Sequence, residues 1–206
     1  MEEKNTNIRL EAFCDGVFAI ALTLLIIDIK IPSTENIKTT AGVWQSLKQL
    51  TPGILAFLIS FITILITWVN HHATLKLVHN SSSHFIYANG FLLLTVVIVP
   101  FPTSLLGEFV LTNHAAPAVV LYSAVFGLQA IGWILICKAA LDPANPLTRN
   151  EKARLQIHAN LQKGYYAVVL YSVCTIIAFW FPLTIAIIVA ISWIAWLIVG
   201  IRIKGE

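Results

Sequence analysis

An arginine and an aspartate stand at one end of an apolar run, RLEAFCDGVFAIALTLLIIDIKIP, which occupies residues 9–32. The run is apolar enough to cross a membrane, where an ionised side chain costs about 2 kcal/mol or more. A helix that served only as an anchor would gain nothing from Asp15. We therefore expect its carboxylate to be bound by other polar groups or to take part in moving ions or protons.

Polar side chains in two other apolar runs lie at a depth that matches Asp15. They close the run at 52–70 and open the run at 85–109. Because polar groups at equal depth can satisfy one another, we predict a network between helices that positions the first helix. Its members are Arg9, Phe13, Asp15, Trp68, Asn70, His71, His72 and Asn89. The alternative, in which His71 and His72 are interfacial residues at a helix end, stays open.

An apolar arc runs along the first helix on a different side from Asp15. At about 100° per residue, this arc contains Phe13, Ile20, Leu24, Ile27 and Ile31. Asp15 lies about 140° from Ile20, and Thr23, the only hydroxyl near the arc, lies about 60° from it. The arc is either a packing seam, with the Thr23 hydroxyl bound to its own backbone, or a surface with a separate role.

The composition is that of an all-α membrane protein. Of 206 residues, 58% are hydrophobic and 11% charged, against about 45–50% apolar residues in a soluble domain. The last apolar run is too long for one span of about 20 residues, so we expect a turn at Pro182, behind the aromatic residues 179–181. Residues 1–206 then form one domain of six spans, at about 10–31, 52–70, 85–109, 115–137, 160–180 and 182–203.

Positive charge predicts the orientation of these spans. Ten of the 13 lysine and arginine residues fall on the side of the two termini. The positive-inside rule therefore places both termini in the cytoplasm of a multi-pass protein of the plasma membrane. Residues 32–48 become an outer loop, with a short interfacial helix around Val43, Trp44 and Leu47. The net charge of +3 is too small to indicate a nucleic-acid partner.

Three motifs together resemble the prokaryotic members of the transmembrane protein 175 family, which are cation channels related to the lysosomal potassium channel. The first is Arg9-x-x-x-Phe13-x-Asp15-Gly16 with the apolar residues that follow it. The others are Trp68-Val-Asn-His71-His72 and the stretch from Phe91 to Leu106 that contains Pro100-Phe-Pro102-Thr103-Ser104. Cys14 stands where the family usually has serine, and cysteine is a poorer hydrogen-bond donor.

The resemblance implies a fold, a pore and a permeant ion. Prokaryotic members have six helices per chain and form homotetramers in which the first helix lines a central pore. The family pattern places the hydrophobic gate at Ile20, Leu24 and Ile27, and Thr23 would add selectivity. We therefore expect a potassium-permeable, modestly selective cation channel of a prokaryotic membrane, with no cofactor beyond permeating potassium. Its expected partners are membrane lipid and its own copies, without a small-molecule substrate.

A proton-coupled secondary transporter that uses Asp15 and the nearby histidines is the main alternative. Asp15 lies near one end of its span rather than at the midplane, and no broken helix pair marks a substrate site. An enzyme is less favoured, because His71-His72 lacks the spacing of a metal-binding His-Glu-x-x-His motif and no nucleophile has a base beside it. We therefore expect no enzymatic activity.

Overall fold

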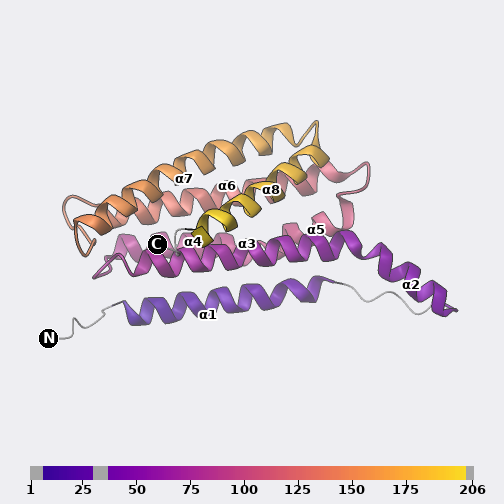
Figure 1. The fold of residues 1–206 in the computed structure, drawn as a ribbon, viewed down its shortest axis with the longest axis horizontal. Coiled ribbons are helices and arrows are strands. Elements are labelled where there is room, and N and C mark those ends of the chain that lie inside the picture. Colours follow the sequence, from indigo (N-terminus) through magenta and orange to yellow (C-terminus); the bar gives the residue numbers. More distant parts are fainter. Residues whose placement is uncertain (1–6, 30–36, 203–206) are drawn as a thin grey trace.

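The computed structural model describes residues 7–29 and 37–202, except for the side chains of Asp28 and residues 197–202. Its regular elements are helices, which confirms the all-α fold class (Figure 1). They are α1 (Ile8–Leu24), the 3-10 helix η1 (Leu25–Asp28), α2 (Thr40–Gln49), α3 (Thr51–Leu75), α4 (Ser83–Ile98), α5 (Pro100–Phe109), α6 (Ala115–Ala140), α7 (Glu151–Ile177) and α8 (Pro182–Arg202). Ile31 of the predicted arc and residues 32–36 of the expected outer loop lie outside the described residues.

Four segments of the described chain are long and apolar enough to cross a membrane. They are Ile8–Ile27, Thr51–Leu75, Ser83–Phe109 and Ala115–Ala140. Pro182–Trp196 is a shorter apolar helix, and α7 carries charged residues in its first turns. The six-span count therefore stays a prediction, whereas the membrane character of the first four spans follows from length and composition.

The third of these segments is two helices rather than one. α4 ends at Ile98 and α5 begins at Pro100, with the Val99 amide bonded to the Val96 carbonyl. Pro100 and Pro102 have no backbone N–H, so two bonds of a continuous helical ladder are missing at this point. The break places the α5 axis against α3, where a Cβ on Gly107 would lie 2.7 Å from the Gly53 Cα atom. The two backbones are therefore in contact.

The turn expected at Pro182 is present. α7 ends at Ile177, and α8 begins at Pro182, whose fixed φ suits the first turn of a helix. The aromatic residues between them, Phe179, Trp180 and Phe181, have exposed side chains. A short helix is also present where an interfacial one was expected: Thr39 caps α2 by accepting a hydrogen bond from the Gly42 amide at 3.0 Å.

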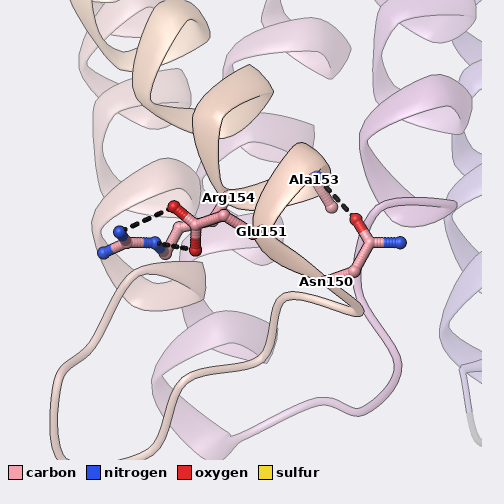
Figure 2. A network of polar contacts seen from close by, with 4 residues as sticks. All are labelled: Asn150, Glu151, Ala153 and Arg154. Carbon is pink, nitrogen blue, oxygen red and sulfur yellow. Dashed lines mark hydrogen bonds and ion pairs between the residues drawn. The ribbon is translucent and has the colours of Figure 1, made fainter.

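α7 begins at Glu151, well before the expected span at 160–180, because the preceding sequence supplies a cap. The Asn150 side chain accepts a hydrogen bond from the Ala153 amide at 2.8 Å (Figure 2). One turn along, the Arg154 guanidinium binds both oxygens of Glu151 at 2.8 Å and holds the pKa of that carboxyl below its usual value. Both charges are exposed, so the pair fixes the helix start more than it stabilises the fold.

The helices are unequally packed. α6 contacts α4, α5, α7 and α8, whereas α1 packs mainly on α3 and α4 and lies along the opposite edge of the bundle from α7 (Figure 1). Between the loops at one end, the Leu77 carbonyl accepts from the Arg149 amide and the Val78 carbonyl from the Arg149 guanidinium, both at 3.0 Å. The loop after α3 is thereby tied to the loop before α7.

Candidate functional site

α1 has one face packed into the protein and one face without a partner among the residues that the structure describes. The buried residues of α1 are Cys14, Phe18 and Ala21, with Leu25 continuing the same side in η1. On the other side, Ile20 is 59% exposed, Ile27 is 70% exposed, and Phe13 and Leu24 are also exposed. The predicted arc is therefore not a packing seam within a single chain. It is an apolar surface that the fold leaves uncovered.

Asp15 lies off this surface and is held by α3. The Trp68 indole nitrogen donates a hydrogen bond to Asp15 Oδ1 at 2.8 Å. The Trp68 ring also stacks on the His72 ring, with centroids 6.0 Å apart and an interplanar angle of 23°. This contact joins the carboxylate of α1 to the last turns of α3, as expected from their matching depth.

A second carboxylate, Glu11, joins the same contact and was not among the predicted site residues. Its Oε1 atom lies 2.9 Å from His72 Nδ1. Glu11 precedes Asp15 by four residues, so one face of α1 presents both carboxylates to α3. That spacing was visible in the sequence and is the signal that could have found Glu11.

His71 makes the second link of the network, between α3 and α4. Its Nε2 atom lies 2.7 Å from Asn89 Oδ1, and both side chains are buried. Asn89 uses its amide nitrogen to donate to the Phe85 carbonyl at 2.7 Å, so its oxygen faces the histidine. The tautomer of neutral His71 that completes this bond carries its proton on Nε2. The His71 ring is also in contact with Phe18 of α1, at a centroid distance of 5.4 Å.

The structure places three of the predicted network residues apart from these bonds. Arg9, Phe13 and Asn70 have exposed side chains, and none of these side chains makes a hydrogen bond or ion pair with a described residue. Cys14 is fully buried and forms no hydrogen bond with any described residue, so it acts as a packing residue. The links found in the chain therefore run through Glu11, Asp15, Trp68, His72 and the His71–Asn89 pair.

The Thr23 hydroxyl binds its own helix. Its Oγ1 atom donates to the Ile20 carbonyl at 2.9 Å, and the side chain is exposed at the edge of the apolar surface. A hydroxyl that donates to the backbone still has lone pairs free to accept. The Thr23 oxygen therefore faces outward with a lone pair free, and such an oxygen can coordinate a cation.

Comparison with known proteins gives concordant results. Residues 9–100 match the family described as endosomal/lysosomal potassium channel TMEM175. A potassium channel of Chamaesiphon minutus is 38% identical over 192 residues, which are 92% of this chain and 94% of the relative. A potassium channel of a Chryseobacterium species is 32% identical over 181 residues, which are 86% of this chain and 85% of the relative. The matched part of the chain includes the described site on α1, α3 and α4.

A solved structure shares the fold. The crystal structure of a lysosomal potassium-selective channel TMEM175 homologue from Chamaesiphon minutus superposes with a TM-score of 0.77 at 38% identity. The superposition covers 91% of this chain and 95% of that chain. The likeness thus extends beyond α4, through the α6–α8 half in which the sequence motifs are sparse.

Proposed function

We propose that this chain, which belongs to the TMEM175 family, forms a potassium-permeable and modestly selective cation channel in the plasma membrane of a prokaryote. One observation carries the proposal: α1 and η1 keep Ile20, Leu24 and Ile27 on a face that no described residue covers, while the other face of α1 packs on α3 and α4. The choice of potassium as the permeant ion rests on relatives that are named as potassium channels. The family also supports the description of the chain as a multi-pass membrane protein.

The uncovered face of α1 is suited to a pore shared between copies of the chain. In the proposed homotetramer, four α1 helices surround a central axis, with six spans per chain and both termini in the cytoplasm. Four Ile20 side chains then form an apolar collar. A cation that enters the collar loses hydration water without gaining a charged replacement, so a narrow collar excludes ions and a wider one conducts.

Thr23 provides the selectivity in this proposal. A ring of four hydroxyl oxygens, each donating to an Ile20 carbonyl, would offer neutral acceptors beside the collar. Neutral oxygens replace the hydration shell of potassium more readily than that of sodium, because sodium holds its water more tightly. The preference should be modest, since hydroxyl groups on a helix surface do not enclose the ion as a carbonyl filter does.

The polar contacts on the other face position α1. Trp68 donates a hydrogen bond to Asp15, His72 Nδ1 lies 2.9 Å from the Glu11 carboxylate, and buried His71 packs on Phe18. These contacts fix the rotation and tilt of α1 relative to α3, and hence the distance of Ile20 from the axis. We assign Arg9, Phe13 and Asn70 to this network only in the assembled channel, where neighbouring copies add partners.

The proton-coupled transporter is the less favoured alternative. It needs Asp15 to exchange protons during a cycle, whereas the described partner of Asp15 is the indole N–H of Trp68, which donates a hydrogen bond but does not ionise near neutral pH and so cannot relay a proton. The relatives are named as channels. Neither observation calls for a transported substrate other than an inorganic cation.

Ion flux into liposomes that contain the purified protein tests the proposal. We expect potassium flux to exceed sodium flux, and N-methyl-D-glucamine to be excluded. Flux should follow the potassium gradient alone, without an imposed pH gradient. A flux that appears only when a proton gradient is applied would favour the transporter, and equal entry of all three cations would indicate a non-selective leak.

A further inference from the structure

A cavity separate from the α1 surface lies among α3, α6, α7 and α8. Its volume is about 360 Å³. Pockets for small organic ligands have volumes from about 300 to 1,000 Å³, so this one has room for a compact molecule. None of its lining residues belongs to α1, α4 or α5. Of the residues assigned to the proposed collar, its hydroxyl ring and the network that positions α1, only Asn70 lines this cavity.

Aromatic rings form much of the cavity wall. They are Phe126, Trp133, Tyr171, Trp193 and Trp196. Three of them already pack on one another: the Trp193 centroid is 5.0 Å from that of Phe126 and 6.3 Å from that of Tyr171. Trp133 and Trp196 are only partly buried. These rings offer flat apolar surfaces against which another ring can stack.

Two residues that line the cavity carry buried nitrogen donors without hydrogen-bond partners among the described residues. They are the side-chain amide nitrogen of Gln129, a residue 2% exposed, and the indole nitrogen of Trp193, a residue 8% exposed. The Tyr171 hydroxyl, by contrast, pairs with Ser192 at 3.2 Å. Buried donors are normally satisfied, so these two donors require an acceptor that the described chain does not supply.

Lys163 is the single cation among the residues that line the cavity. Lys163 lines it beside Gln156 and Asn160, and no aspartate or glutamate is among the lining residues. α6 and α7 are antiparallel, with Gly127 opposite Tyr171 and Gly164 opposite Ile134. This register places Lys163 about six residues, or about 9 Å, from Gln129 along the helix axis.

We propose that this cavity binds a flat aromatic anion, with its anionic group at Lys163, its ring against Trp133 and Trp196, and an acceptor atom at Gln129 and Trp193. Each part of the ligand matches one feature of the wall. The anionic group pairs with Lys163, which has no carboxylate beside it in the lining, the ring stacks on the tryptophan faces, and the acceptor atom pairs with the unpaired donors. Water alone answers only the last of these, because it has neither a ring face to stack on the tryptophans nor a negative charge to pair with Lys163.

The test uses the full chain in nanodiscs of zwitterionic lipid, titrated by calorimetry with 6-hydroxy-2-naphthoate. This probe has a carboxylate at one end of a bicyclic ring and an oxygen at the other. We expect saturable binding that Lys163→Met and Gln129→Leu each weaken about tenfold or more. Lys152→Met, which removes an exposed cation from the same helix outside the cavity, should leave the affinity unchanged.

Two further measurements separate a binding role from a structural one. Gln129→Leu removes an unpaired buried amide, so we expect it to raise the unfolding temperature of the ligand-free protein while it weakens binding. The probe 2-naphthoate lacks the far oxygen and should bind wild type and Gln129→Leu with equal, lower affinity. Heats equal to those of empty nanodiscs, or an unchanged affinity in Lys163→Met, would overturn the proposal and leave the cavity to water or lipid.

Discussion

Helices α1 and α6 are both apolar enough to span a membrane, but the fold uses them differently. α6 buries 14 of its 26 residues and contacts four other helices, whereas α1 buries three of its 17 residues and has an apolar face with no partner in the described part of the chain. Packing explains the apolar residues of α6. It does not explain those on the outer face of α1. Apolar residues that the packing of the described chain leaves uncovered are therefore the ones to examine for function.

Substitutions in the packed interior should lower the yield of folded protein. Substitutions on the outer face of α1 should alter ion flux while the protein stays folded. A change on the outer face that unfolds the chain would break the distinction, and a change in the interior that only alters conduction would break it as well.

The largest effect is expected at the contact between α3 and α5. In Gly107→Ala, the new Cβ would lie 2.7 Å from the Gly53 Cα atom, a backbone atom that no side-chain rotation can move away. The helices must separate, at a cost of about 1–3 kcal/mol or more. We expect a loss of folded protein in size-exclusion chromatography and a lower unfolding temperature.

Gly53→Ala is the matched control for this change. It adds the same methyl group to the partner helix, but its nearest neighbour, the Gly107 Cα atom, would be 4.0 Å away, an ordinary contact distance. A stability equal to that of wild type is expected. If both alanine variants lose the same stability, helix separation is not the cause.

A polar residue in the proposed collar should have the next largest effect. Ile20→Asn would wet the collar and raise potassium flux about tenfold, which corresponds to a barrier lower by about 1.4 kcal/mol. The unfolding temperature should change little, because Ile20 is exposed within the chain. Liposome flux and thermal unfolding measure the two properties separately.

Ile136→Asn is the matched interior variant, because Ile136 of α6 is 1% exposed. The same substitution should destabilise the fold there, since it buries an amide without a partner. If Ile20→Asn protein assembles normally and its flux equals that of wild type, Ile20 is not the gate.

Sequence periodicity was sufficient to find the outer face of α1. Residues 20, 24 and 27 return to one side of a helix, whatever surrounds it, so their common side could be predicted. Whether that side is buried or exposed could not be predicted, because it depends on the packing of the other helices. The turn at Pro182 was equally local. Depth alone grouped Asp15 with Trp68 and His71 with Asn89, but it could not say which donor meets which acceptor, because that depends on helix rotation.

Features that depend on several helices were missed. The cavity is lined by Gln129, Trp193 and Lys163 from three different helices, and no spacing in the sequence predicts that these residues line one cavity. The separation of α4 from α5 was missed for another reason: Pro100 and Pro102 were visible, but proline is tolerated inside membrane helices and does not by itself specify a break. Glu11 was missed although its spacing from Asp15 was in view.

Asp15 tests whether the packed face of α1 acts through helix position. Asp15→Asn keeps the size of the side chain and an oxygen that can accept from Trp68, but it removes the charge. We expect the open probability or the yield of the proposed tetramer to change, with the unitary current unaltered. Single-channel recording in planar bilayers separates these quantities, and a lower unitary current at normal open probability would place Asp15 in the ion path.

The smallest effect is expected at Thr23. Thr23→Val keeps the shape of the side chain and removes the oxygen that faces outward, so the collar should still conduct. The ratio of potassium to sodium permeability should fall about threefold, or by about 0.6 kcal/mol, within the range of one hydrogen bond. Reversal potentials under bi-ionic conditions measure this ratio directly.

The control for Thr23 is Thr95→Val in α4, because the two hydroxyls make the same kind of bond in opposite settings. Thr95 Oγ1 donates to the Leu92 carbonyl at 2.6 Å, three residues back, as Thr23 does to Ile20, but Thr95 is buried away from the outer face of α1. Loss of a backbone-bound hydroxyl is therefore common to both variants, and only exposure toward the proposed pore differs. A lower ratio in Thr23→Val alone assigns selectivity to the Thr23 ring. An equal fall in both would mean that the threonine acts through helix geometry, and an unchanged ratio in Thr23→Val would move selectivity to another part of the pore.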